Sequence, residues 1–188
     1  MKKMIIGLIV GIVSTLVIVF IILVGIAEGG FSFMAPGYNT MDNYLKKNID
    51  VLSHVSDVLF ELDYDSVDIR KVALSDEDKC NMVVVKRDLF EDGSSGINRE
   101  TISVPDELLD PIDYLFNNGV SVISCGRDSV GFSMWSTMSE SRGIQYSRTG
   151  GKPDGEQLIE VKQLSKENWY YYVHNFEKWK AQNPELFQ

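Results

Sequence analysis

The sequence has few of the residues on which most catalytic and metal sites depend. It contains 2 His and 2 Cys among 188 residues, and neither His54 nor His174 belongs to a recognised metal-binding motif. The segment Gly131-Phe132-Ser133-Met134-Trp135 resembles a nucleophile elbow only at its start, because Trp135 replaces the second glycine. We therefore predict no cofactor and no metal, and we identify no catalytic residues.

Positive charge is also scarce. The chain has 18 Lys and Arg residues against 27 Asp and Glu residues, and Lys2 and Lys3 are followed by a long uncharged run. The remainder therefore carries 16 basic and 27 acidic residues, a net charge of −11. Such a chain lacks the basic surface that nucleic-acid phosphates require, and anionic lipid head groups repel it. Nucleic acid is excluded as a predicted partner.

Charge is absent altogether from residues 4–27, a run of 24 residues rich in Ile, Val and Leu. As a helix this run would reach about 36 Å, enough to cross a hydrocarbon core of about 30 Å. Basic flanks stay on the cytoplasmic side. We therefore predict a cytoplasmic N-terminus at residues 1–3 and a transmembrane helix at 4–27, with the rest of this cell-membrane protein outside the cytoplasm.

A cleaved secretory signal peptide is the alternative to this anchor. Gly25-Ile26-Ala27 supplies the small residues that signal peptidase requires before Glu28. A signal peptide has an apolar core of about 7 to 15 residues, which is shorter than this run. The length favours a signal-anchor that stays in the bilayer, and cleavage after Ala27 stays open.

Small residues form one stripe of the predicted span. Gly7 and Gly11 are four residues apart, and Thr15 continues the spacing. This Gly-x-x-x-Gly pattern lets two membrane helices approach closely, so it favours a homodimer through the span. The alternative is that the stripe has no role in self-association, because glycine is common in membrane helices in general.

Residues 28–37 contain three Gly and one Pro, which is typical of a linker. The 151 residues from 38 to 188 are close to the common size of one domain. Apolar residues at three- and four-residue steps predict an amphipathic helix over Thr40–Leu62, capped by Thr40 or Asp42. We expect its apolar stripe to pack on a sheet.

Short apolar runs separated by turn residues predict strands after this helix. They span 67–74, 80–87, 97–104, 120–125, 130–136, 143–147, 158–164 and 168–173. A helix is predicted between Pro105 and Gly119, broken into two pieces by Pro111. The short turns favour antiparallel neighbours. The predicted fold is therefore α+β: an N-terminal transmembrane helix followed by one domain, an antiparallel β-sheet packed by two or three helices.

Two cysteines, Cys80 and Cys125, lie in the predicted domain. On an oxidising side of the membrane they can pair, and closing a loop of about 45 residues would stabilise the fold by about 4 kcal/mol. Two buried thiols that pack as small apolar side chains are the alternative.

Aromatic residues gather in the last predicted strand. Alternation sends Trp169 and Tyr171 to one face and Tyr170 and Tyr172 to the other. One face has to be core, and the other, joined by Trp135, is a possible binding face for a peptide, a glycan or a protein. The alternative is that both faces are covered.

The last third of the chain resembles small membrane-tethered bacterial proteins of unknown function. The resemblance rests on Glu140–Ser147, Gly151–Asp154 and Trp169–Tyr172. It implies a bacterial membrane protein but no activity, ligand or site residue.

The leading functional hypothesis is a single-pass membrane protein whose outer domain binds another protein or a surface polymer. One alternative is a membrane-tethered hydrolase that uses Ser133, His174 or a carboxylate pair. A second alternative is a structural subunit of an envelope complex, which would expose a large apolar patch.

Overall fold

The computed structural model describes residue 15 and residues 35–70, 81–89, 95–137 and 139–187. The chain divides into two compact units, Met1–Ala35 and Pro36–Gln188. The predicted span at 4–27 lies outside the described residues except for Thr15, as do Gly7, Gly11 and Cys80. Among the helices described, none combines the length and the apolar character needed to cross a membrane.

The second unit is an α+β domain built on one sheet. Its eight strands lie in the order β3-β2-β1-β4-β5-β6-β8-β7, and every neighbouring pair is antiparallel. The strands are β1 (Ser66–Arg70), β2 (Asn81–Leu89), β3 (Ser95–Ser103), β4 (Val122–Cys125), β5 (Ser129–Ser136), β6 (Glu140–Ser147), β7 (Leu158–Gln163) and β8 (Trp169–Asn175). The predicted antiparallel α+β architecture is confirmed.

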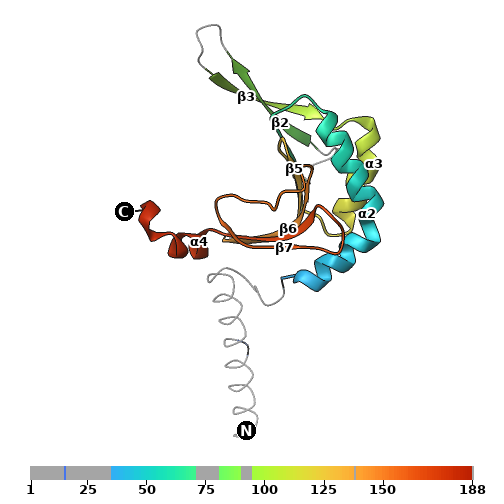
Figure 1. The fold of residues 1–188 in the computed structure, drawn as a ribbon. Coiled ribbons are helices and arrows are strands. Elements are labelled where there is room, and N and C mark those ends of the chain that lie inside the picture. The colour runs from blue at the N-terminus through green and yellow to red at the C-terminus, as the bar shows by residue number, and fades with distance from the viewer. Residues whose placement is uncertain (1–14, 16–34, 71–80, 90–94, 138, 188) are drawn as a thin grey trace, which may run out of the picture. The chain divides into compact units, whose positions relative to one another are not determined.

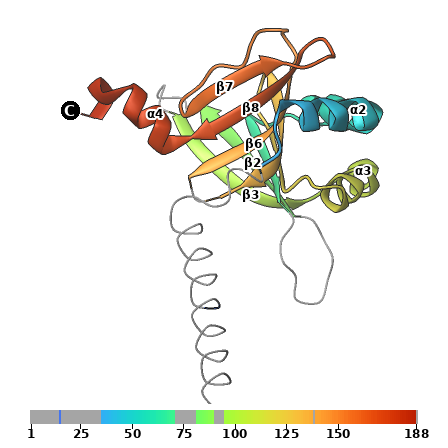
Figure 2. The same cartoon turned by 90° about the horizontal axis from the view of Figure 1, so that it is seen from below.

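Helices α2 (Tyr38–Glu61) and α3 (Asp106–Asn117) lie side by side on one face of the sheet (Figures 1 and 2). The stripe of α2 is buried there, as the sequence predicts, through Leu45, Leu52, Val55 and Leu59. Strand residues on the same face, among them Phe132, complete one apolar core. The chain ends with α4 (Phe176–Gln182) and a short 3-10 helix, η2 (Pro184–Phe187).

The start of α2 differs from the prediction. Gly37 is the N-cap residue and no side chain caps the helix, so the prediction of Thr40 or Asp42 as the cap is wrong. The Asp42 carboxylate instead accepts a hydrogen bond from the Ser165 backbone N–H at 2.8 Å. Lys46 pairs with the other carboxylate oxygen at 2.6 Å. Asp42 therefore ties α2 to the turn between β7 and β8.

Pro111 lies inside α3 without breaking it, which corrects the prediction of two short helices. A proline at this position removes one hydrogen bond, the one to the carbonyl of Glu107. Glu107 is an exposed residue in the first turn, where water can satisfy its carbonyl. Leu108 and Ile112 are completely buried on the apolar side of α3, and this burial holds the helix together across the proline.

The carboxylate of Asp42 gives the domain a measurable pH dependence. Its hydrogen bonds, first to Lys46 and then to Ser165, lower its pKa from 3.8 to about 2. Because the folded pKa is lower than the unfolded one, this stabilisation is present above about pH 4. It is lost as the pH falls through about 2.

We predict that Asp42→Asn flattens the decline in unfolding free energy between about pH 4 and pH 2 and destabilises the domain at neutral pH by about 1–2 kcal/mol. Urea unfolding of the full chain in detergent micelles, followed by tryptophan fluorescence, measures this. Lys46→Met removes the same ion pair and should flatten the same window. Parallel pH curves for all three proteins would contradict the assignment.

Candidate functional site

The sheet face opposite α2 and α3, here called the open face, carries a cavity of about 400 Å³. Five serine side chains from four strands line this cavity, which is called the serine pocket. The serines are Ser66, Ser124, Ser129, Ser133 and Ser141. The lining also includes Asp68, Gly131, Gln145, Asp154 and His174. A hollow on a sheet face needs a local reason, because side chains normally fill the space.

Strand register gives the first reason. Asp68, Ser124, Gly131 and Gln145 are partners across β1, β4, β5 and β6, so they form one row across the open face. Gly131 has no side chain, and the row is therefore empty at its third position. A Cβ at Gly131 would lie 3.1 Å from Ser124 Oγ. The floor of the serine pocket is thus bare backbone between a serine and an amide.

The next row gives the second reason. Ser133, Gly143 and Tyr172 are partners across β5, β6 and β8. The Tyr172 ring lies over Gly143, where an added Cβ would be 2.6 Å from Tyr172 Oη and 2.2 Å from the Phe132 carbonyl oxygen. Its hydroxyl reaches Ser133 Oγ at 2.7 Å. Gly143 therefore allows a buried tyrosine to cross one strand and form a wall of the pocket.

The loop between β6 and β7 closes one side of the pocket. Tyr170 Oη donates a hydrogen bond to the Gly150 carbonyl at 2.9 Å, which holds the loop against β8. Asp154 and Leu158 then line the cavity from the loop side. His174 stands beside Tyr172, with ring centroids 5.2 Å apart. This side of the pocket is therefore formed by Tyr172 and His174 of β8 and by a loop that the buried Tyr170 anchors.

The serine pocket has negative but no positive formal charge at neutral pH. Its lining includes the carboxyl groups of Asp68 and Asp154 and no Lys or Arg. Burial lowers the pKa of His174 below its ordinary value, so this imidazole is neutral at pH 7. Burial also raises the pKa of the Cys125 thiol to about 11 and keeps it protonated. The pocket therefore offers neutral groups that donate and accept, with two carboxylates.

A second cavity of about 160 Å³ adjoins the first. Ser141 and His174 line both cavities. The second cavity continues the polar lining through Ser136, Ser139 and Gln157. The two cavities are therefore neighbours that share part of their polar lining, and together they are called the groove.

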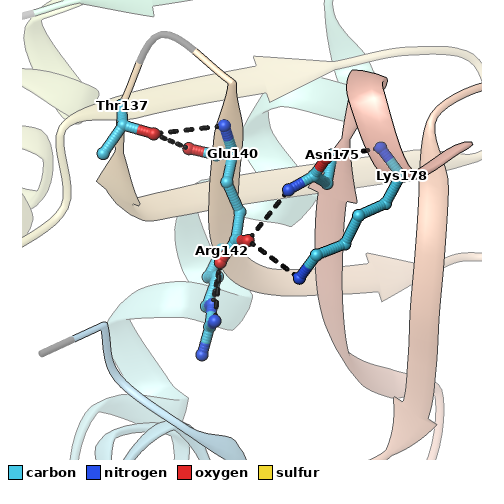
Figure 3. Close-up of polar contacts among 5 residues, drawn as sticks. All are labelled: Thr137, Glu140, Arg142, Asn175 and Lys178. Carbon is cyan, nitrogen blue, oxygen red and sulfur yellow. Dashed lines mark hydrogen bonds and ion pairs between the residues drawn. The ribbon is translucent and has the colours of Figure 1, made fainter. Parts of the chain in front are cut away.

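A buried ion cluster holds this end of the groove in place (Figure 3). The Glu140 side chain is 3% exposed and binds Arg142 at 2.6 Å, with Lys178 3.8 Å away. Asn175 Nδ2 donates to the same carboxylate at 3.0 Å. Thr137 closes the turn, since its hydroxyl accepts from the Glu140 N–H at 3.1 Å. All polar groups of Glu140 are engaged in bracing the hairpin against β8 and α4.

The aromatic residues on both faces of β8 are buried. Trp169, Tyr170 and Tyr172 are 3%, 7% and 5% exposed. Trp169 stacks on Phe132 in the core, with ring centroids 6.1 Å apart. Trp135 is half-buried beneath Arg142, whose guanidinium lies 5.7 Å from the ring centroid. Trp169, Tyr170 and Tyr172 therefore present no exposed aromatic face, and of the four predicted rings only Tyr172 lines the serine pocket.

Ser133 and His174 lie in the same cavity but are not a nucleophile and base pair. In the described part of the chain, Ser133 Oγ bonds to Tyr172 Oη and makes no hydrogen bond to His174. Burial raises the pKa of the Tyr172 hydroxyl, so this group stays protonated and does not act as a base at neutral pH. Cys125 is a free buried thiol, and its predicted partner Cys80 lies outside the described residues.

The serine pocket was not predicted from the sequence, although a signal was present. Ser124 stands between buried Ile123 and Cys125, and Ser129 and Ser133 flank buried Val130 and Phe132. This alternation marks a half-buried strand with a small polar outer face. The convergence of five serines on one hollow depends on strand order, which such local patterns do not contain.

Comparison of the chain with models of known protein families, with curated proteins and with solved structures gave no match. Fold alone does not determine function. The function of the serine pocket therefore has to be inferred from its own chemistry.

We predict that Gly143→Ala destabilises the domain by about 3 kcal/mol, because the new methyl group would overlap the Phe132 carbonyl and the Tyr172 hydroxyl. Gly126→Ala is the matched control, since a Cβ there meets nothing within 4 Å. Urea unfolding compares both with the wild type. Equal unfolding midpoints for the two variants would contradict the close approach at Gly143.

We also predict that a fluorophosphonate probe, which labels activated serine nucleophiles, leaves the full chain unlabelled. The reason is that Ser133 Oγ is bound to a protonated tyrosine rather than to a general base. Mass spectrometry after incubation provides the measurement, with chymotrypsin in the same mixture as a positive control. Labelling that disappears in Ser133→Ala would favour the hydrolase instead.

Proposed function

We propose that this chain is a single-pass membrane-anchored binding protein. In this proposal residues 4–27 span the cell membrane, Lys2 and Lys3 stay in the cytoplasm, and the domain at 38–188 lies outside. The serine pocket on the open face is the ligand-binding site. The ligand is a molecule outside the cytoplasm, such as a surface polymer or another protein.

The anchor is supported by the sequence. The 24 residues from 4 to 27 carry no charge, and a helix of that length matches the thickness of a bilayer. The two lysines before the run, and the lack of basic residues after it until Lys46, favour an outward-facing domain. A homodimer through Gly7 and Gly11 is compatible with this topology and is not needed for it.

The binding role is supported by one observation above all: polar side chains from five strands surround an unfilled hollow of about 400 Å³. The core on the other sheet face already contains the large apolar side chains that stabilise the domain. A glycine-floored hollow adds no packing energy, because empty space forfeits van der Waals contact. Convergent polar groups around such a hollow are typical of a ligand site.

The two alternatives have less support in the described residues. The hydrolase lacks a nucleophile bonded to a base, as the contact between Ser133 and Tyr172 indicates. An envelope subunit would need a large apolar patch. The exposed large apolar side chains are distributed over β2, β3, α3, α4 and η2, namely Val83, Ile97, Leu109, Tyr114, Phe176 and Leu186.

The anchor predicts that the protein stays in the membrane pellet after washes with high salt and with alkaline carbonate, and dissolves only in detergent. A tag fused after Gln188 should be digested by protease added to spheroplasts, while a cytoplasmic marker survives. Release by salt alone, or a protected tag on sealed cells, would contradict the anchor or its orientation.

The binding site predicts that filling the hollow abolishes binding without unfolding the domain. Gly131→Val places a side chain in the empty position of the row and should weaken binding by at least about tenfold. Thr101→Val is the matched control, because Thr101 lies on the same face beside Val83 and outside the pocket lining.

The measurement is isothermal titration calorimetry on the full chain in detergent micelles. The probes are tetramers of N-acetylglucosamine, glucosamine, glucose and galacturonate, and tetra-alanine as a peptide. Circular dichroism verifies the fold of each variant. The proposal fails if no probe binds, or if Gly131→Val and Thr101→Val bind every probe equally well.

A further inference from the structure

We infer that the serine pocket takes a carbohydrate chain whose sugars are uncharged or carry amines, and that His174 contacts the chain where it passes from the larger cavity to the smaller one. This inference rests on the proposed binding function and names the class of ligand.

Charge disfavours anionic ligands. The lining of the serine pocket contains the carboxyl groups of Asp68 and Asp154 and no Lys or Arg that could neutralise a phosphate or a carboxylate. Asp68 and Asp154 are exposed, so water and salt weaken their repulsion of an anion, but the lining offers an anion no positively charged partner. The net charge of −11 on the chain beyond residue 27 adds repulsion at long range. Amines, in contrast, would pair with either aspartate.

Hydrogen-bonding capacity favours hydroxyl-rich ligands. A serine hydroxyl both donates and accepts, and so do a glutamine amide and a neutral imidazole. The pocket sets five serines, Gln145 and His174 around one hollow. A sugar hydroxyl has the same dual capacity, so a sugar can satisfy these groups in either direction. A carboxylate such as Asp68 only accepts, and it can accept from two neighbouring hydroxyls of one ring.

The lining mixes many polar groups with a few apolar side chains, which favours a sugar over an apolar peptide side chain as the main ligand. Peptide-binding sites bury aromatic or aliphatic anchors in apolar pockets. Here the large apolar side chains of the sheet point to the helices, and Tyr172 is only 5% exposed. Leu158 supplies limited apolar contact, of the kind that the C–H face of a sugar ring requires.

The second cavity favours an oligosaccharide over a single sugar. It shares Ser141 and His174 with the serine pocket and continues the hydroxyl and amide lining through Ser136, Ser139 and Gln157. A linear chain can therefore place one unit over the Gly131 floor and the next units beyond His174. The Glu140 cluster braces the hairpin that forms this second cavity.

The calorimetric panel described above tests the inference. We expect the tetramers of N-acetylglucosamine, glucosamine or glucose to bind at least about tenfold more tightly than tetragalacturonate, the sugar tetramer in the panel that carries carboxylates. Asp68→Asn should selectively weaken the glucosamine tetramer relative to the two neutral tetramers. Because Asp68 is exposed, Asp68→Asn should leave the fold intact. It therefore tests the inference even if Gly131→Val fails to fold.

The length of the ligand is tested separately. A tetramer should bind at least about tenfold more tightly than its monomer, and Ser139→Ala should reduce this difference without changing monomer binding. Equal affinity for monomer and tetramer would overturn the two-cavity arrangement.

The outcomes separate the inference from the proposed function. If tetragalacturonate or tetra-alanine binds in a manner that Gly131→Val abolishes, and the neutral and amine tetramers do not bind, the pocket is a binding site but the sugar class is wrong. If no probe binds, both proposals fail. Selective binding of neutral or amine tetramers, lost in Gly131→Val and kept in Thr101→Val, supports both.

Discussion

Burial of one sheet face against α2 and α3 is the constraint on which the rest of the domain depends. Residues alternate between the two faces of a strand, so a slip of one residue would exchange them. In β5, Val130 and Phe132 are completely buried on the helix side. A slipped register would place Ser129 and Ser133 in the core, at the cost of unsatisfied hydroxyl groups. The hydrophobic face therefore fixes the position of every polar group on the open face.

The shape of the open face depends in turn on two glycines with different roles. Gly143 is filled from outside, since the Tyr172 ring occupies the space that a side chain would take. Gly131 stays uncovered between Ser124 and Gln145, its partners in the row. Gly143 thus lies beneath a wall of the serine pocket, whereas Gly131 forms its floor. The difference arises because Tyr172 of β8 is the direct partner of Gly143, whereas Gln145 lies between Gly131 and Tyr170.

Much of the fold could be predicted from local patterns. The stripe of α2 is strictly periodic, and the turn Gly126–Ser129 correctly separates two strands. Strand order could not be predicted in this way. In the sheet β1 pairs with β4, although β2, β3 and α3 lie between them in the chain, and β8 lies between β6 and β7. The serine pocket depends on that order. Pro111 was misjudged for a related reason: burial of Leu108 and Ile112 outweighs a local helix breaker.

Stability and recognition therefore occupy opposite faces of one sheet. The apolar core needs the helix side to be filled, but it places no such demand on the open face, where Asp68 and Ser124 add little packing. Residues there are free to match a ligand as long as the strand backbone is kept. Gly143 and Tyr172 are the exception, because their contact both supports β6 and shapes the pocket. A change at this pair alters fold and site together, whereas a side chain at Gly131 meets only the Ser124 side chain closely and acts mainly on the site.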